Sequence, residues 1–233
     1  MNLHLFSTPG EPFLHDLLEV SQSLLGSQRN PVVLYLPAAS VERHFIRETR
    51  AAFSGLAKVI TIKVESHPSD KVRAVLARVN LLFIPGGNTY LLAQRLHTAG
   101  IINDIRQHVL NSLPLVAFSA GTVLCGQDIL TTNDINCCGC TTFAGLGLIP
   151  FNINVHYPSE DGEQRQERDY RLWEYQQFHN TSVLALEDEV YIRVTGNRFE
   201  VVRGTCWWFA KGKLKTKFNH EVKPLGVQHM EQL

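Results

Sequence analysis

Apolar runs recur along the first half of the chain, and the segments between them have the apolar spacing of helices. The runs are rich in β-branched residues and do not alternate with polar ones, which is typical of strands covered on both faces. They lie within residues 30–40, 57–66, 80–92 and 113–121. This order of strands and helices predicts an open, doubly wound α/β domain with a mostly parallel sheet.

Three segments with helical periodicity separate these runs, at 41–56, 69–79 and 93–111. We expect the last of them to be interrupted near Gly100, and a further helix to begin at Asn88 or Thr89. Helices of this kind between parallel strands cover the two faces of the sheet.

The pattern changes after about residue 130, where the chain becomes polar and rich in loops. An amphipathic helix is predicted at 164–180, followed by short strands over 182–218. Hairpin turns are expected at Thr195-Gly196-Asn197 and at Lys211-Gly212. No repeat or linker is visible, so we predict a single α/β domain over 1–233 with a β-hairpin region near its C-terminus.

Charge gives no indication of a nucleic-acid or membrane partner, because Lys plus Arg and Asp plus Glu are both 22. No stretch approaches the ~18 apolar residues of a membrane span. The first residues have no charged leader and too short an apolar run for a signal peptide. We therefore expect a soluble, cytoplasmic protein.

Three of the five cysteines, Cys137, Cys138 and Cys140, are clustered. The C-C-x-C spacing does not supply two CxxC-type pairs for zinc, and the nearest histidine is His156. We interpret the cluster as reduced cytosolic thiols and predict no metal site.

Ser119 follows a buried strand and precedes Ala120, Gly121 and a short helical segment. Active groups of parallel sheets lie at the carboxyl ends of strands, and a strand–Ser–small–Gly–helix sequence is similar to a nucleophile elbow. Ala117 stands where the common elbow has Gly, and it is still small. The alternative is that Ser119 merely caps the following helix.

Gly86 and Gly87 end the preceding strand and allow the backbone to approach a ligand closely. The N–H groups of Gly87 and Ala120 are therefore candidates for an oxyanion hole. A tight turn is the alternative. A phosphate-binding loop is not favoured, because no G-K-[ST] follows.

Five segments together resemble the peptidase E family of aspartyl dipeptidases, in order and spacing: FIPGGNTYLL, VAFSAGTVL, TTNDIN, GLGLIPFNINVHY and GEQRQER. The resemblance covers about residues 80–204. It implies a serine peptidase with a flavodoxin-like core, related to class I glutamine amidotransferases, that acts on small peptides without a cofactor.

The resemblance also implies the catalytic roles. Ser119 is the expected nucleophile and His156 the general base, which passes the serine proton to the leaving amine. Asp134 matches a family aspartate assigned to the charge relay. The alternative acid is Asp188, which stands where the family usually has Glu in a Pro-Glu-Gly-like step.

Arg165 and Arg168 stand where the family has similar arginines, and an arginine fork suits a substrate carboxylate. The family cleaves dipeptides with N-terminal aspartate. The sequence departs from it at Gln164, at the acid step and in the cysteine-rich insert, so the hydrolase class is the firmer expectation. A carboxypeptidase-like or cyanophycinase-like specificity stays open.

Two other classes compete with this interpretation. One is a non-catalytic peptide-binding module on the same fold. The other is an amidotransferase-like enzyme with a cysteine nucleophile. The serine at the elbow argues against it, and so does the position of Cys125 inside the following helical segment. The oligomeric state is open, a homodimer included.

Overall fold

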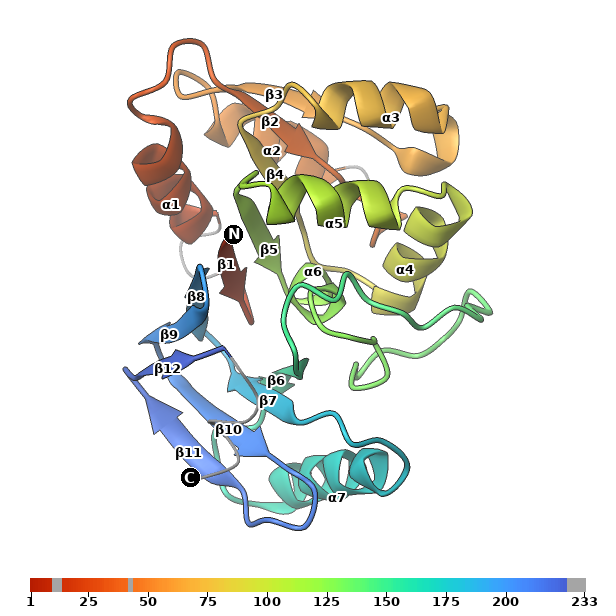
Figure 1. Ribbon diagram of the computed structural model, residues 1–233, viewed down its shortest axis with the longest axis vertical. Coiled ribbons are helices and arrows are strands. Elements are labelled where there is room, and N and C mark those ends of the chain that lie inside the picture. Colours follow the sequence, from red (N-terminus) through yellow and green to blue (C-terminus); the bar gives the residue numbers. More distant parts are fainter. Residues whose placement is uncertain (10–13, 42–43, 226–233) are drawn as a thin grey trace.

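The main sheet of the computed structural model, which describes residues 1–9, 14–41 and 44–225, contains eight strands. Their order is β12-β9-β8-β1-β5-β4-β2-β3 (Figure 1). β1 to β5 run parallel, whereas β8, β9 and β12 extend the sheet in antiparallel pairs. The bounds are β1 Asn2–Phe6, β2 Val32–Tyr35, β3 Lys58–Thr61, β4 Leu81–Ile84, β5 Leu115–Phe118, β8 Tyr191–Thr195, β9 Arg198–Arg203 and β12 Val222–Pro224.

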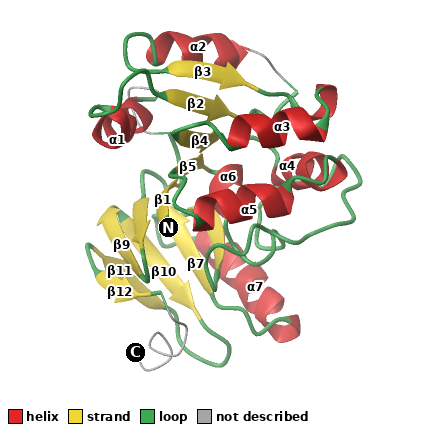
Figure 2. Cartoon of the chain, turned by 45° about the horizontal axis from the view of Figure 1, so that its top comes forward, coloured by secondary structure: helices red, strands yellow, loops and turns green. Residues whose placement is uncertain are grey.

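Helices cover both faces of the parallel part (Figure 2). Successive residues of a strand point to opposite faces, so Leu115 and Ala117 pack in one layer and Val116 and Phe118 in the other. One layer holds α1 (His15–Leu25) and α2 (His44–Ala52). The other holds α3 (Ser69–Leu76), α4 (Thr89–Thr98) and α5 (Ile102–Leu110), with the short 3₁₀ turn η1 (Val64–Ser66) leading into it.

A smaller mixed sheet follows in the second half of the chain, in the order β11-β10-β7-β6. Its strands are β6 Asn152–Tyr157, β7 Val183–Glu187, β10 Thr205–Phe209 and β11 Thr216–Asn219, and α7 (Glu163–Phe178) covers one face. Tyr157 and Val183 pack beneath Leu172 of α7. Leu184 and Trp208 point the other way and join the core of the main sheet.

The predicted α/β fold with a mostly parallel sheet is confirmed. Asn88 caps α4 by accepting from the Leu91 N–H, and positive φ at Gly100 separates α4 from α5 as expected. The hairpin turns at Gly196 and Gly212 join β8 to β9 and β10 to β11. The single-domain assignment stays a prediction.

The sequence did not reveal β1 or α1. β1 has only five residues, Asn2–Phe6, and includes two polar ones, so its pattern is weak on its own. Pairing with β5 on one side and β8 on the other fixes it in the centre of the sheet. Tertiary contacts therefore determine this strand more than its own composition does.

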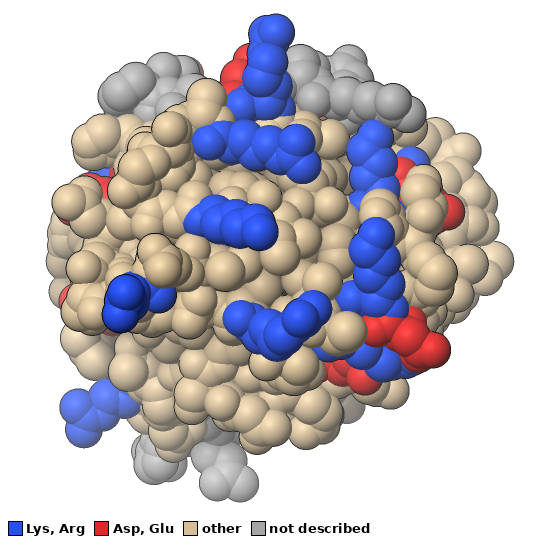
Figure 3. Space-filling model, turned by 90° about the horizontal axis from the view of Figure 1, so that it is seen from above, with Lys and Arg blue, Asp and Glu red and all other residues tan. Residues whose placement is uncertain are grey.

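The surface beyond the edge strand β3 carries more Lys and Arg than Asp and Glu, and most of these cations stand apart from one another (Figure 3). Over the described ranges, the helices are all too short or too polar to cross a membrane.

Candidate active site

Ser119 occupies a strained turn between β5 and the short helix α6 (Ala120–Leu124). Its backbone has φ 47° and ψ −107°, a region that non-glycine residues rarely adopt. Its Oγ makes no capping bond to α6 and lies 3.0 Å from His156 Nε2. The side chain is therefore turned out of the helix and towards the His156 imidazole, as in a nucleophile elbow.

Two glycines make room for this turn. A Cβ on Gly121 would lie 2.4 Å from the Ile84 carbonyl oxygen, so α6 packs against the end of β4 only without a side chain there. A Cβ on Gly86 would lie 3.1 Å from the Cβ of Ser119. The small residues around the serine thus follow from the close approach of two strand ends.

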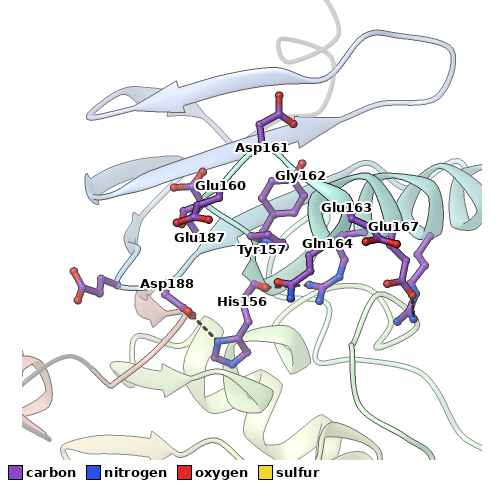
Figure 4. A pocket seen from close by; sticks show the side chains of 15 residues that line it. His156, Tyr157, Glu160, Asp161, Gly162, Glu163, Gln164, Glu167, Glu187 and Asp188 are labelled. Carbon is purple, nitrogen blue, oxygen red and sulfur yellow. Dashed lines mark hydrogen bonds and ion pairs between the residues drawn. The ribbon is translucent and has the colours of Figure 1, made fainter.

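His156 reaches Ser119 from the other sheet. It lies in β6 at φ 55°, where the pairing with β7 shifts register between Asn154 and Tyr157. This irregularity turns the imidazole out of the small sheet towards the main one, with Nδ1 held 2.7 Å from Asp188 Oδ1 (Figure 4). Ser119, His156 and Asp188 consequently form one chain of contacts across the two sheets.

The two acids offered by the sequence have different partners. Asp188 follows β7 and contacts His156. Asp134 Oδ2 accepts from the Thr89 backbone N–H at 2.7 Å, the Thr89 hydroxyl at 2.6 Å and the Thr132 hydroxyl at 3.0 Å. Asp134 thereby fixes its loop to the positive N-terminal end of α4.

The residues after β1 hold His156 and the turn that follows Asp188 in place. Ser7 Oγ accepts from the His156 backbone N–H at 3.0 Å, and Thr8 Oγ1 accepts from the Glu189 N–H at 3.0 Å. Sequence reasoning missed both residues because it missed the strand. The available signal was a pair of hydroxyl residues directly after the apolar run of β1, at the carboxyl end where parallel sheets carry their chemistry.

The two candidate oxyanion donors lie beside the serine. Ala120 is the first residue of α6, so its N–H has no partner within the helix. Gly87 has φ 133°, and a Cβ on it would lie 2.4 Å from the Ala39 carbonyl oxygen, which also accepts from the Asn88 N–H. Only glycine fits at residue 87 in this arrangement.

A polar cavity of about 950 Å³ opens beside His156 and Asp188. Figure 4 shows acidic side chains around it, including Glu160 and Glu187, and α7 along one side. The cations among the described residues that line it are Arg168 and Arg171, both from α7.

The two predicted substrate-binding arginines are placed differently. Arg168 lines the cavity and donates from Nη1 to the Asn154 side-chain oxygen and to the carbonyl of His156, at 3.1 and 3.2 Å. Burial, and then repulsion from Arg171, lowers the pKa of Arg168.

Arg165 is buried, and its guanidinium donates to the carbonyl oxygens of Pro158 and Ser159 and to Glu187. It lies outside the lining of the polar cavity, so the structure does not bring it together with Ser119 and His156.

Cys125 is a poor candidate for the nucleophile of a cysteine-dependent enzyme. It is fully buried, its Sγ contacts the Gly121 carbonyl at 3.3 Å, and burial raises the pKa of its thiol strongly. A buried neutral thiol is inert. The cysteines of the chain are all unpaired, and Cys137 is exposed.

The model of peptidase family S51 matches residues 5–202. The chain belongs to this family. Among its curated relatives, peptidase E of Haemophilus influenzae strain PittGG is 31% identical over 161 residues, which is 67% of this chain and 69% of that protein. A Drosophila melanogaster protein described as a probable alpha-aspartyl dipeptidase is 35% identical over 136 residues, 57% of each chain.

The fold also agrees with a solved peptidase structure. The crystal structure of a peptidase from an acI-B1 Actinobacterium superposes with a TM-score of 0.67 and 16% identity, covering 96% of each chain. The family match and the curated relatives confirm the predicted resemblance to the peptidase E family, and the solved structures confirm the peptidase E-like α/β fold.

Proposed function

We propose that the protein is a serine peptidase that hydrolyses short peptides through an acyl-enzyme on Ser119. The observation that carries the proposal is the continuous contact chain from Ser119 Oγ through the His156 ring to Asp188, at 3.0 and 2.7 Å. A serine, a histidine and a carboxylate in contact in this order are what acyl transfer needs, and this supports the proposal. Membership of family S51 supports the same reaction class.

In the proposed reaction, His156 Nε2 takes the proton of Ser119 Oγ as the oxygen attacks the scissile carbonyl. The N–H groups of Gly87 and Ala120 stabilise the resulting oxyanion. His156 then protonates the leaving amine, which leaves an ester on Ser119. A water molecule deprotonated by His156 hydrolyses the ester and restores the free serine.

Asp188 is the orienting acid in this proposal. Its contact with Nδ1 keeps a proton on that nitrogen, so that Nε2 faces Ser119 as an acceptor. Asp134 has a positioning role instead, because Thr89 and Thr132 occupy its Oδ2.

We further propose that Arg168 and Arg171 bind a substrate carboxylate in the polar cavity. Two kinds of peptide offer such a carboxylate. One is a dipeptide with N-terminal aspartate, in line with the name of the Drosophila relative, a probable alpha-aspartyl dipeptidase. The other is a short peptide whose leaving residue has a free α-carboxylate. The unpaired cysteines support a reducing compartment, so we keep the cytoplasm as the expected location.

Hydrolysis of a panel of dipeptides and tripeptides, varied at both ends, tests the proposal. We expect the wild type to release free amino acids from some members and Ser119→Ala to lose at least about 10³-fold in kcat. Circular dichroism of the variant is expected to match the wild type. Undiminished turnover by a folded Ser119→Ala would exclude the acyl-enzyme, and no turnover by the wild type would favour a non-catalytic binding module.

A further inference from the structure

A second, smaller pocket opens beside Ser119, with a volume of about 200 Å³. The described residues that line it are all uncharged: Pro9, Leu14, Tyr35, Ser40, Phe45, Thr49, Phe83, Pro85, Gly86, Gly87, Phe118 and Ser119. We refer to this set as the apolar pocket. Its composition contrasts with the polar cavity, where acids and arginines predominate.

Aromatic rings form much of the wall of the apolar pocket. The rings of Tyr35 and Phe83 stack with centroids 5.3 Å apart, and Phe83 meets Phe118 edge to face at 5.3 Å. Phe118 directly precedes Ser119. The hydroxyl of Tyr35 is hydrogen-bonded to Thr49, and burial raises its pKa. The polar atom of the tyrosine is thus already partnered, and its ring is what faces a ligand.

The apolar pocket and the polar cavity each contain one of the two reacting residues. Ser119 lines the apolar pocket, whereas His156 lines the polar cavity. The acyl group stays bonded to Ser119 Oγ, while the leaving amine takes its proton from His156 Nε2. The acyl residue therefore lies against the apolar pocket, and the leaving residue extends towards Arg168 and the polar cavity.

We propose that the apolar pocket binds the side chain of the residue that supplies the acyl group, and that this side chain is leucine, methionine or phenylalanine. The inference rests on the proposed peptidase function. Apolar cavities of about 150 Å³ hold a benzene-sized molecule, so this pocket has room for one such side chain. An aspartate carboxylate there would be largely desolvated, and the described lining residues include no cation to offset that cost.

Phe45 offers a way to alter the pocket without touching the reacting groups. It lies in α2 and is 38% exposed, so its truncation removes part of the pocket wall without opening the core. Phe178 at the end of α7 is 81% exposed and lies outside both lining sets, which makes Phe178→Ala the matched control.

The test compares Phe-Ala, Leu-Ala, Ala-Ala and Asp-Ala as substrates. We expect kcat/KM for Phe-Ala and Leu-Ala to exceed that for Ala-Ala by at least about 10-fold, with Asp-Ala the poorest. Phe45→Ala should lower the ratio of Phe-Ala to Ala-Ala by about 10-fold, and Phe178→Ala should leave it unchanged.

Calorimetric binding of the same dipeptides to Ser119→Ala examines the pocket separately from catalysis. The dissociation constants should follow the same order. A preference for Asp-Ala, or equal dissociation constants for Phe-Ala and Ala-Ala, would overturn the apolar pocket while leaving the peptidase proposal intact. Absence of turnover by the wild type, together with tighter binding of Phe-Ala, would instead contradict the peptidase and support the pocket.

Discussion

At the scale of residues, the two candidate aspartates have different environments and therefore different expected roles. Asp188 is exposed and contacts the imidazole of His156, where it can orient the ring and stabilise the imidazolium. Asp134 accepts its hydrogen bonds at the start of α4, where a carboxylate also interacts favourably with the helix dipole.

This difference predicts unequal effects of two matched substitutions. Asp188→Asn should lower kcat by roughly 10³- to 10⁴-fold, because an amide no longer holds the imidazole in the required tautomer. Asp134→Asn should change kcat by less than about 10-fold, while lowering the free energy of unfolding by about 1–3 kcal/mol through weakened charged hydrogen bonds. Steady-state kinetics give kcat and urea unfolding gives the stability of each variant. A larger loss of kcat in Asp134→Asn than in Asp188→Asn would assign the orienting role to Asp134.

The sequence identified part of the site because that part depends on a local pattern of residue types. A hydroxyl on a tight turn with small neighbours is a local pattern, and Ser119 and His156 are in contact as that pattern and the family register predict. The choice between Asp134 and Asp188 depends on which loop reaches the imidazole, and no local pattern carries that information. Their catalytic roles stay a proposal.

At the scale of elements, the serine is positioned by the packing of α6 against the ends of β4 and β5. The turn holds Ser119 in a strained conformation because Gly121 lets the helix approach the Ile84 carbonyl. The alternation of strands and helices was readable from apolar periodicity. β1 was not, because five residues with two polar side chains carry too little periodic signal.

Gly121→Ala tests the importance of this close approach. The added Cβ would lie 2.4 Å from the Ile84 oxygen, so α6 must shift. We expect the free energy of unfolding to fall by about 1–3 kcal/mol and kcat/KM to fall with it. The control is Gly162→Ala, where the Cβ meets nothing within 4 Å and the cost should stay below about 1 kcal/mol. Equal stability losses in the two variants would contradict this packing.

At the scale of the whole molecule, the site exists only where the two sheets meet. The main sheet supplies Ser119 after β5 and Ser7 after β1, and the small sheet supplies His156 from β6 and Asp188 after β7. No single segment of the sequence contains this arrangement. The antiparallel strand β8 also pairs with β1, and there the buried His4 of β1 is hydrogen-bonded to the Tyr191 hydroxyl of β8.

His4 makes stability depend on pH. Burial first, and then Arg193, lowers the pKa of His4 from 6.5 to about 4. Below pH 6.5 the unfolded chain binds a proton at this histidine and the folded chain does not, so stability is lost as the pH falls towards 4.

We expect the wild type to lose about 2 kcal/mol of unfolding free energy at this residue between pH 7 and pH 5. His4→Gln should lack this component, and the difference between the two urea-unfolding series isolates it from other titrating groups. If the unfolding free energies of wild type and His4→Gln depended on pH in the same way, His4 would have the same protonation in the folded and the unfolded chain, which would contradict this account.

The most direct test of the central claim is reaction with a fluorophosphonate, followed by peptide mapping of the modified residue. The account predicts one adduct on Ser119, lost in Ser119→Ala, formed much more slowly in Asp188→Asn, and accompanied by loss of peptide hydrolysis. Unimpaired hydrolysis after treatment while Ser119 stays unlabelled, or an adduct that maps to another residue, would contradict it.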